Sequence, residues 1–132
     1  MDNIWLGRTP DKRQLQPFAA VVDICTELPL NVGARGYQAV PVLDLTVPTA
    51  EQCLLAAQSI ERLRQHGPLL VCCALGYSRS ATAVAAWLLY SGRAETVDKA
   101  VAMIREAAPK IVLRDGHLAV LQQLPKSYES QT

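Results

Sequence analysis

A short apolar run joins a helix-like segment through the stretch Val71-Cys72-Cys73-Ala74-Leu75-Gly76-Tyr77-Ser78-Arg79-Ser80. Five residues separate Cys73 from Arg79 within it. A loop that leaves a strand and enters a helix points several backbone N–H groups at one place, and the helix dipole adds partial positive charge there. The stretch therefore predicts an anion-binding loop between a strand and a helix.

The side chains of Cys73 and Arg79 add reactive chemistry to this loop. The guanidinium of Arg79 presents parallel N–H donors that match two oxygens of a phosphate. Positive charge around Cys73 favours its thiolate, the nucleophilic form of cysteine. Attack of sulfur on phosphorus, followed by hydrolysis of the cysteinyl-phosphate, requires both groups on one loop. A buried core cysteine is the alternative role for Cys73, and the glycine and arginine at phosphate-loop spacing argue against it.

The same stretch resembles a known family. Cys73 to Ser80 is similar to the signature of the cysteine-dependent protein tyrosine phosphatases, and Gly76 to Ser80 resembles their dual-specificity branch. Low-molecular-weight phosphatases and some arsenate reductases share the cysteine–arginine spacing, but they carry it near the N-terminus. Here the signature is central. The resemblance extends over nearly the whole chain, and the segments similar to the family's first strands are Ile4–Arg8, Val21–Glu27 and Tyr37–Leu45.

This resemblance implies both a fold and a site. The fold is α/β, with a mostly parallel central sheet of four to five strands flanked by helices. A phosphatase domain would occupy residues 1–125, and residues 126–132 would form a polar tail. The site needs no metal and no cofactor, and its phosphate-binding loop comprises Cys73, Ala74, Leu75, Gly76, Tyr77, Ser78 and Arg79.

Two further residues complete the predicted catalytic set. The leaving oxygen needs a proton from a carboxylic acid on a separate loop. Asp44 has the family's placement, about 30 residues before the cysteine, and its alternative role is to form a turn. Asp23 lies inside a predicted strand and Asp115 at a helix start, so both are weaker candidates. Ser80 is predicted to donate a hydrogen bond to the nucleophilic sulfur, a role compatible with capping the helix.

The signature departs from the family at one position. The residue before the nucleophile is usually a histidine that orders the loop and favours the thiolate, but here it is Cys72. Because neighbouring strand residues point to opposite faces, Cys72 is a poor disulfide partner for Cys73. The loop side chains Ala74, Leu75 and Tyr77 are neutral, unlike the lysine-rich loop of relatives that cleave inositol polyphosphates.

Cys25 resembles a second cysteine that traps the oxidised nucleophile in some relatives. Its strand is expected beside the signature strand, so a reversible Cys25–Cys73 disulfide is a hypothesis, with a packed strand-end cysteine as the alternative. His66 and His117 fit neither metal-ligand spacing nor a visible cysteine–histidine pairing. Both are interpreted as surface residues or residues behind the site.

Composition bounds the remaining possibilities. The chain has 132 residues and a net charge of +1, from 13 basic and 12 acidic residues. One domain is expected, and no charge pattern favours nucleic acid or an anionic membrane. The four cysteines show no disulfide framework and follow no signal peptide, which favours the cytoplasm. The apolar segment 81–90 is about half the ~20 residues of a membrane span. A further region before Met1 is left open.

Apolar patterns and turn residues predict the elements. Strands are expected at Ile4–Gly7, Ala20–Cys25, Ala39–Leu43 and Leu69–Cys73. A capping box formed by Thr49 and Gln52 starts a helix that ends before Gly67. A second helix follows the signature and ends at Gly92, with one face formed by Ala81, Val84, Ala85, Leu88 and Leu89. Thr96 caps a third helix, and Asp115 opens a fourth.

The predicted function is hydrolysis of phosphate monoesters, most simply by a dual-specificity phosphatase acting on phosphotyrosine and phosphothreonine in proteins. Its partner is then a phosphorylated protein or a small phosphomonoester. Two alternatives remain open. One is a lipid or nucleotide phosphomonoesterase of the same fold. The other is a non-catalytic phosphoprotein-binding pseudophosphatase, which the cysteine in place of the usual histidine motivates.

Overall fold

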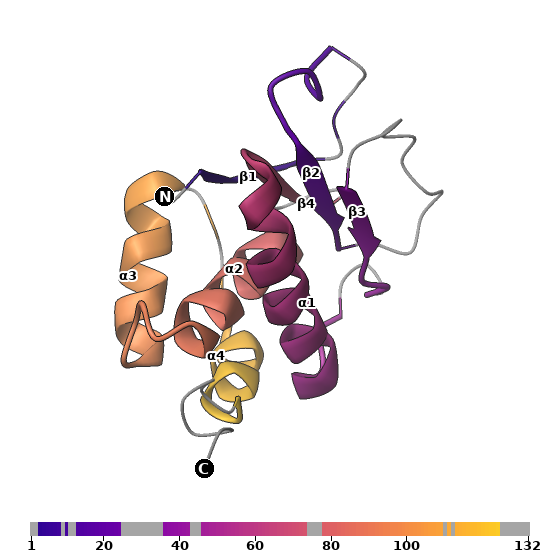
Figure 1. Ribbon diagram of the computed structural model, residues 1–132. Helices are drawn as coiled ribbons and strands as arrows, with labels where there is room; N and C mark the ends of the chain where they lie inside the picture. Colours follow the sequence, from indigo (N-terminus) through magenta and orange to yellow (C-terminus); the bar gives the residue numbers. More distant parts are fainter. Residues whose placement is uncertain are drawn as a thin grey trace.

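The computed structural model describes residues 3–8, 10, 13–24, 36–42, 46–73, 78–109, 111 and 113–124. Strands and helices alternate through the first part of the chain, and helices follow (Figure 1). The elements are β1 (Ile4–Arg8), β2 (Ala20–Asp23), β3 (Gly36–Ala39), α1 (Ala50–Leu63), the 3₁₀ turn η1 (Arg64–His66), β4 (Leu69–Cys73), α2 (Ser78–Tyr90), α3 (Val97–Ala107) and α4 (Asp115–Gln122).

The four strands form one parallel sheet in the order β1-β4-β2-β3. The strand that carries the signature, β4, therefore lies between β1 and β2. In register, Cys72 pairs with Asp23 of β2 and with Gly7 of β1. This arrangement confirms the predicted α/β fold. The end of β4 lies at the carboxyl ends of the parallel strands, where ligands bind in such folds.

The two faces of the sheet are covered differently. One face packs against the helices and forms the main core, to which β4 contributes Leu69, Val71 and Cys73. The other face carries Leu70 and Cys72, which form a smaller cluster with Val21 and Leu15. Because side chains alternate along a strand, the neighbouring cysteines of β4 enter different clusters, as the sequence predicts.

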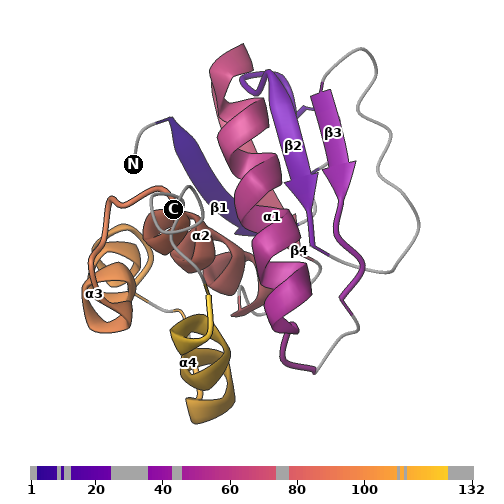
Figure 2. The same ribbon diagram turned by 60° about the horizontal axis from the view of Figure 1, so that its bottom comes forward.

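Helices α1 and α2 pack against each other over the sheet, and α3 lies at the side of the molecule far from β3 (Figures 1 and 2). The start of α1 is the predicted capping box: the Gln52 N–H donates to the Thr49 hydroxyl, and the Thr49 N–H donates to Oε1 of Gln52. Thr96 likewise caps α3, by accepting from the Lys99 N–H.

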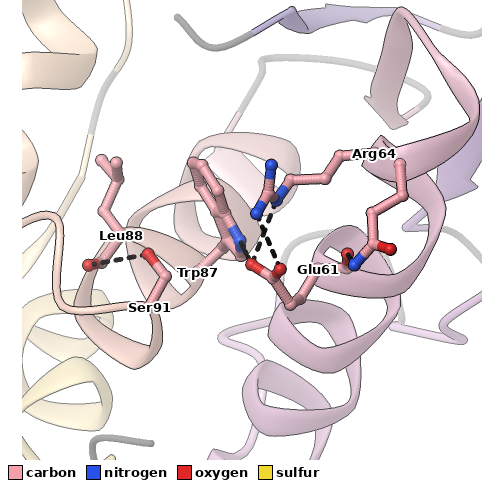
Figure 3. A network of polar contacts seen from close by, with 6 residues as sticks. Glu61, Arg64, Trp87, Leu88 and Ser91 are labelled. Carbon is pink, nitrogen blue, oxygen red and sulfur yellow. Dashed lines mark hydrogen bonds and ion pairs between the residues drawn. The ribbon is translucent and has the colours of Figure 1, made fainter.

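A polar cluster joins α1, η1 and α2 (Figure 3). The carboxylate of Glu61 accepts from Nε1 of the buried Trp87 at 3.1 Å and from two guanidinium nitrogens of Arg64 at 3.1 and 2.8 Å. The Arg64 hydrogen bond lowers the pKa of Glu61 from its ordinary value. The guanidinium of Arg93 lies 4.3 Å from the Trp87 ring centroid. The indole N–H thus enters the helix interface with its hydrogen bond satisfied.

The predicted boundaries of the third strand were wrong. The third strand is Gly36–Ala39, not Ala39–Leu43. Val40 and Val42 are buried beyond the end of this strand, and the Val40 N–H still donates to the Asp23 carbonyl of β2 at 2.8 Å. β3 is partly exposed because it is an edge strand of the sheet. The second helix, α2, runs from Ser78 to Tyr90 and so begins beside Arg79, as expected. No helix in the described ranges is long and apolar enough to span a membrane.

Candidate active site

Cys73 is the last residue of β4 and is fully buried, with its side chain on the helix-covered face of the sheet. Ser80, in the first turn of α2, is also fully buried. A hydrogen bond of 3.4 Å joins Sγ of Cys73 and Oγ of Ser80. When the sulfur is a thiolate, the serine hydroxyl is the group that donates. The structure therefore brings the predicted nucleophile and its predicted donor together.

Arg79 is held in the first turn of α2 and is only 3% exposed. Its Nη1 donates to the carbonyl of Val42 at 2.8 Å. The guanidinium lines a small cavity together with the side chains of Ile24, Val42 and Cys53. The arginine is thus anchored by the segment that leads towards Asp44, two residues after Val42.

Gln52 ties this same segment to α1. Its Nε2 donates to the Pro41 carbonyl at 2.7 Å, while its Oε1 accepts from the Thr49 N–H at 2.8 Å. One amide side chain therefore links residues on both sides of 43–45 to the helix start. Sequence reasoning identified Gln52 as part of the capping box but missed the bond to Pro41, which depends on the tertiary fold.

Several predicted site residues lie outside the described residues. These include the candidate acid Asp44, the candidate redox partner Cys25 and the loop residues 74–77. Their roles stay predictions. Among the residues that the structure does describe, no group of three or more histidine, cysteine or acidic side chains could hold a metal ion.

A second polar group lies behind the nucleophile, on the other face of the sheet. Asp23 ends β2 and is 2% exposed. Its Oδ2 accepts from the Tyr37 hydroxyl at 2.8 Å, and its Oδ1 accepts from Sγ of Cys72 at 3.8 Å. The sequence ranks Asp23 as a weaker candidate acid than Asp44 and does not predict this contact. Strand alternation was the available signal, since it directs the Cys72 side chain away from the loop.

Two other ionisable residues, Cys53 and His117, are buried and were not among the predicted catalytic residues. Burial raises the pKa of the Cys53 thiol to about 12, which makes it unreactive at neutral pH. His117 was interpreted as a surface residue or a residue behind the site; it is 7% exposed, so the first of these interpretations was wrong. Its Nδ1 accepts from the Arg114 N–H at 3.1 Å. Burial, followed by the charge of Arg114, lowers the pKa of His117 and favours the neutral ring.

Comparison with known proteins gives consistent matches. Residues 4–127 match the family described as dual specificity phosphatase, catalytic domain. Tk-PTP in its active form is 30% identical, with a TM-score of 0.78 over 92% of this chain and 90% of that one. Human DUSP28 is 22% identical, with a TM-score of 0.82 over 100% and 97%. PTPMT1 in complex with PI(5)P is 22% identical, with a TM-score of 0.80 over 93% and 90%. No curated protein matches the sequence.

Proposed function

This chain belongs to the family of dual specificity phosphatase catalytic domains and is a cysteine phosphatase, and from that premise we propose that it removes phosphate from phosphotyrosine and phosphothreonine in proteins. The observation that carries the chemistry is the hydrogen bond between Sγ of Cys73 and the hydroxyl of Ser80, with Arg79 in the same helix turn. The neutral side chains of the loop support a monoester substrate rather than a polyphosphorylated headgroup.

In the proposed mechanism Cys73 attacks the phosphorus in line with the leaving oxygen. Backbone amides of the loop and Arg79 hold the equatorial oxygens while charge redistributes. Asp44 protonates the leaving oxygen and then, as a carboxylate, activates the water that hydrolyses the cysteinyl-phosphate. Ser80 stabilises the sulfur as a thiolate, first as nucleophile and then as leaving group. The four cysteines without a disulfide framework support a cytoplasmic location.

A second candidate substrate is a phosphate monoester on a lipid. PTPMT1, which shares the fold, has been captured in complex with PI(5)P. The non-catalytic pseudophosphatase is the candidate from another class, motivated by Cys72 in place of the usual histidine.

Turnover of p-nitrophenyl phosphate separates these classes. Cys73→Ser and Arg79→Ala are each expected to lower the rate by orders of magnitude, because one removes the nucleophile and the other the group that holds the phosphate. EDTA should leave the rate unchanged. Near-normal turnover by the serine variant, or dependence on a metal, would overturn the mechanism.

Substrate class and the acid are tested on the active protein. Phosphotyrosine and phosphothreonine peptides should be hydrolysed faster than PI(5)P in phosphatidylcholine vesicles, and the reverse order would favour the lipid candidate. Asp44→Asn should slow an alkyl phosphate more than p-nitrophenyl phosphate, because the poorer leaving group needs protonation more. Equal losses on both substrates would remove Asp44 from the acid role.

A further inference from the structure

The buried carboxylate of Asp23 is placed one strand away from the nucleophile. It pairs in register with Cys72, the residue directly before Cys73, and the Ile24 N–H donates to the Cys72 carbonyl at 2.8 Å. The ends of β2 and β4 are therefore joined by both backbone and side-chain hydrogen bonds.

Both oxygens of the Asp23 carboxyl group accept hydrogen bonds. One oxygen accepts from the Tyr37 hydroxyl and the other from the Cys72 thiol. A carboxylate accepts hydrogen bonds at both oxygens, whereas a carboxylic acid also has an O–H group that needs an acceptor. Cys72 acts here as a thiol that donates, so it adds no positive charge behind the loop. A histidine at the same position would add one.

We propose that Asp23 is a positioning residue of this phosphatase site, which acts through Cys72 and through its own charge to set the pH above which Cys73 reacts. A negative charge beside the signature strand disfavours a second negative charge nearby, so removal of the Asp23 charge should let Cys73 react at a lower pH. The proposal rests on the proposed function for its kinetic consequence, but the reactivity of the sulfur can be measured without turnover.

The charged surroundings decide the size of the effect. Tyr37 of β3 and Cys72 of β4 face Asp23, and Arg13, on the segment that covers this face, is exposed. On the nucleophile's side, the Arg79 guanidinium belongs to the first turn of α2. Strands about 4.8 Å apart with side chains on opposite faces put the two charges on the order of 10 Å apart. At that separation, removal of the Asp23 charge should move the reactivity by about half to one pH unit.

The test measures two pH profiles for each variant of the whole chain. One is kcat/KM with p-nitrophenyl phosphate. The other is the rate of iodoacetamide alkylation at Cys73, assigned by fragmentation of the tryptic peptide 65–79, which separates it from Cys72. Asp23→Asn should move both acid midpoints down by about half to one unit. Asp98→Asn, which removes an exposed carboxylate of α3, is the matched control and should move neither.

Cys72→His provides an independent arm that does not require Asp23→Asn to fold. The introduced imidazole would pair with the Asp23 carboxylate, stay protonated and move both midpoints down. In the double variant, which combines Asp23→Asn with Cys72→His, the buried imidazole lacks that partner and favours its neutral form. The shift of the midpoint should then be less than the sum of the shifts in the two single variants. Unchanged alkylation midpoints in Asp23→Asn, or in Cys72→His where the first variant does not fold, would overturn the proposal. A shifted alkylation midpoint in a chain without phosphatase activity would instead overturn the proposed function.

Discussion

The hydroxyl of Ser80 is expected to matter more for the second chemical step than for the first. In that step the sulfur of Cys73 leaves phosphorus as a thiolate, and the hydroxyl 3.4 Å away stabilises it. Hydrogen bonds to charged groups contribute about 1.5–3 kcal/mol, so Ser80→Ala should slow hydrolysis of the cysteinyl-phosphate about tenfold or more.

Rapid-quench kinetics with p-nitrophenyl phosphate checks this expectation at the residue scale. A burst of nitrophenolate followed by a slow steady state should appear in Ser80→Ala. Ser91→Ala removes a hydroxyl that donates to the Leu88 carbonyl of α2 (Figure 3), and this variant should behave as wild type. If the burst and the steady state were slowed by the same factor, Ser80 would also act in the first step, the formation of the cysteinyl-phosphate.

At the same scale, the sequence predicted residues whose chemistry depends on local spacing. Cys73, Arg79 and Ser80 lie within eight consecutive residues, so a strand–loop–helix pattern is sufficient to bring them together. The contact of Asp23 with Cys72 and Tyr37 depends instead on how β2 registers with β4 and β3. The spacing of residues along the chain does not determine this register, so the partners of Asp23 could not be predicted from the sequence.

At the scale of elements, the start of α1 does two tasks that one substitution can separate. Gln52→Glu keeps an acceptor for the Thr49 N–H, since glutamate is equally suited to a capping box. It loses the N–H donor to the Pro41 carbonyl and places a negative oxygen where the structure has a 2.7 Å hydrogen bond. The segment that precedes Asp44 should then be less well held, although the helix keeps its cap.

We expect Gln52→Glu to unfold within about 1 kcal/mol of wild type and to lose about tenfold in kcat for alkyl phosphates, because small misplacement of a catalytic group is costly. Thr49→Ala is the matched variant: it removes the other side of the cap, should lose about 1 kcal/mol in stability and should retain more activity. Urea unfolding and kcat measured on the same samples check both. Equal activity in the two variants would contradict a separate role for the Pro41 bond.

The helices and strands also show which boundaries can be predicted from the sequence pattern. Helix starts were predicted where a side chain caps them, at Thr49 and Thr96, because capping is a contact between residues three apart. The third strand was misplaced because Val40 and Val42 have the apolar character of a buried strand, yet they lie beyond its end at Ala39 and are buried in the main core. The predicted adjacency of the second strand and the signature strand is confirmed, since β2 pairs with β4.

For the whole molecule, burial of Cys53 in the core predicts how stability responds to alkaline pH. The folded pKa of this thiol is about 12, raised from 9.0 by burial. Between these values the unfolded chain loses the proton while the folded chain keeps it, so the folded state binds more protons and the free energy of unfolding falls as pH rises. The loss attributable to Cys53 should reach about 2 kcal/mol near pH 10.5.

Urea unfolding of wild type and Cys53→Ala at pH 7.5 and 10.5 measures this loss. At pH 7.5 the variant should be less stable, because it leaves a small cavity beneath α1. At pH 10.5 the difference should shrink or reverse by about 2 kcal/mol, since alanine has no proton to lose. Ser59→Ala removes a buried hydroxyl that does not titrate in this range from the same helix, and its effect should be equal at both pH values. A Cys53→Ala difference that stays constant with pH would show that other groups govern the alkaline loss.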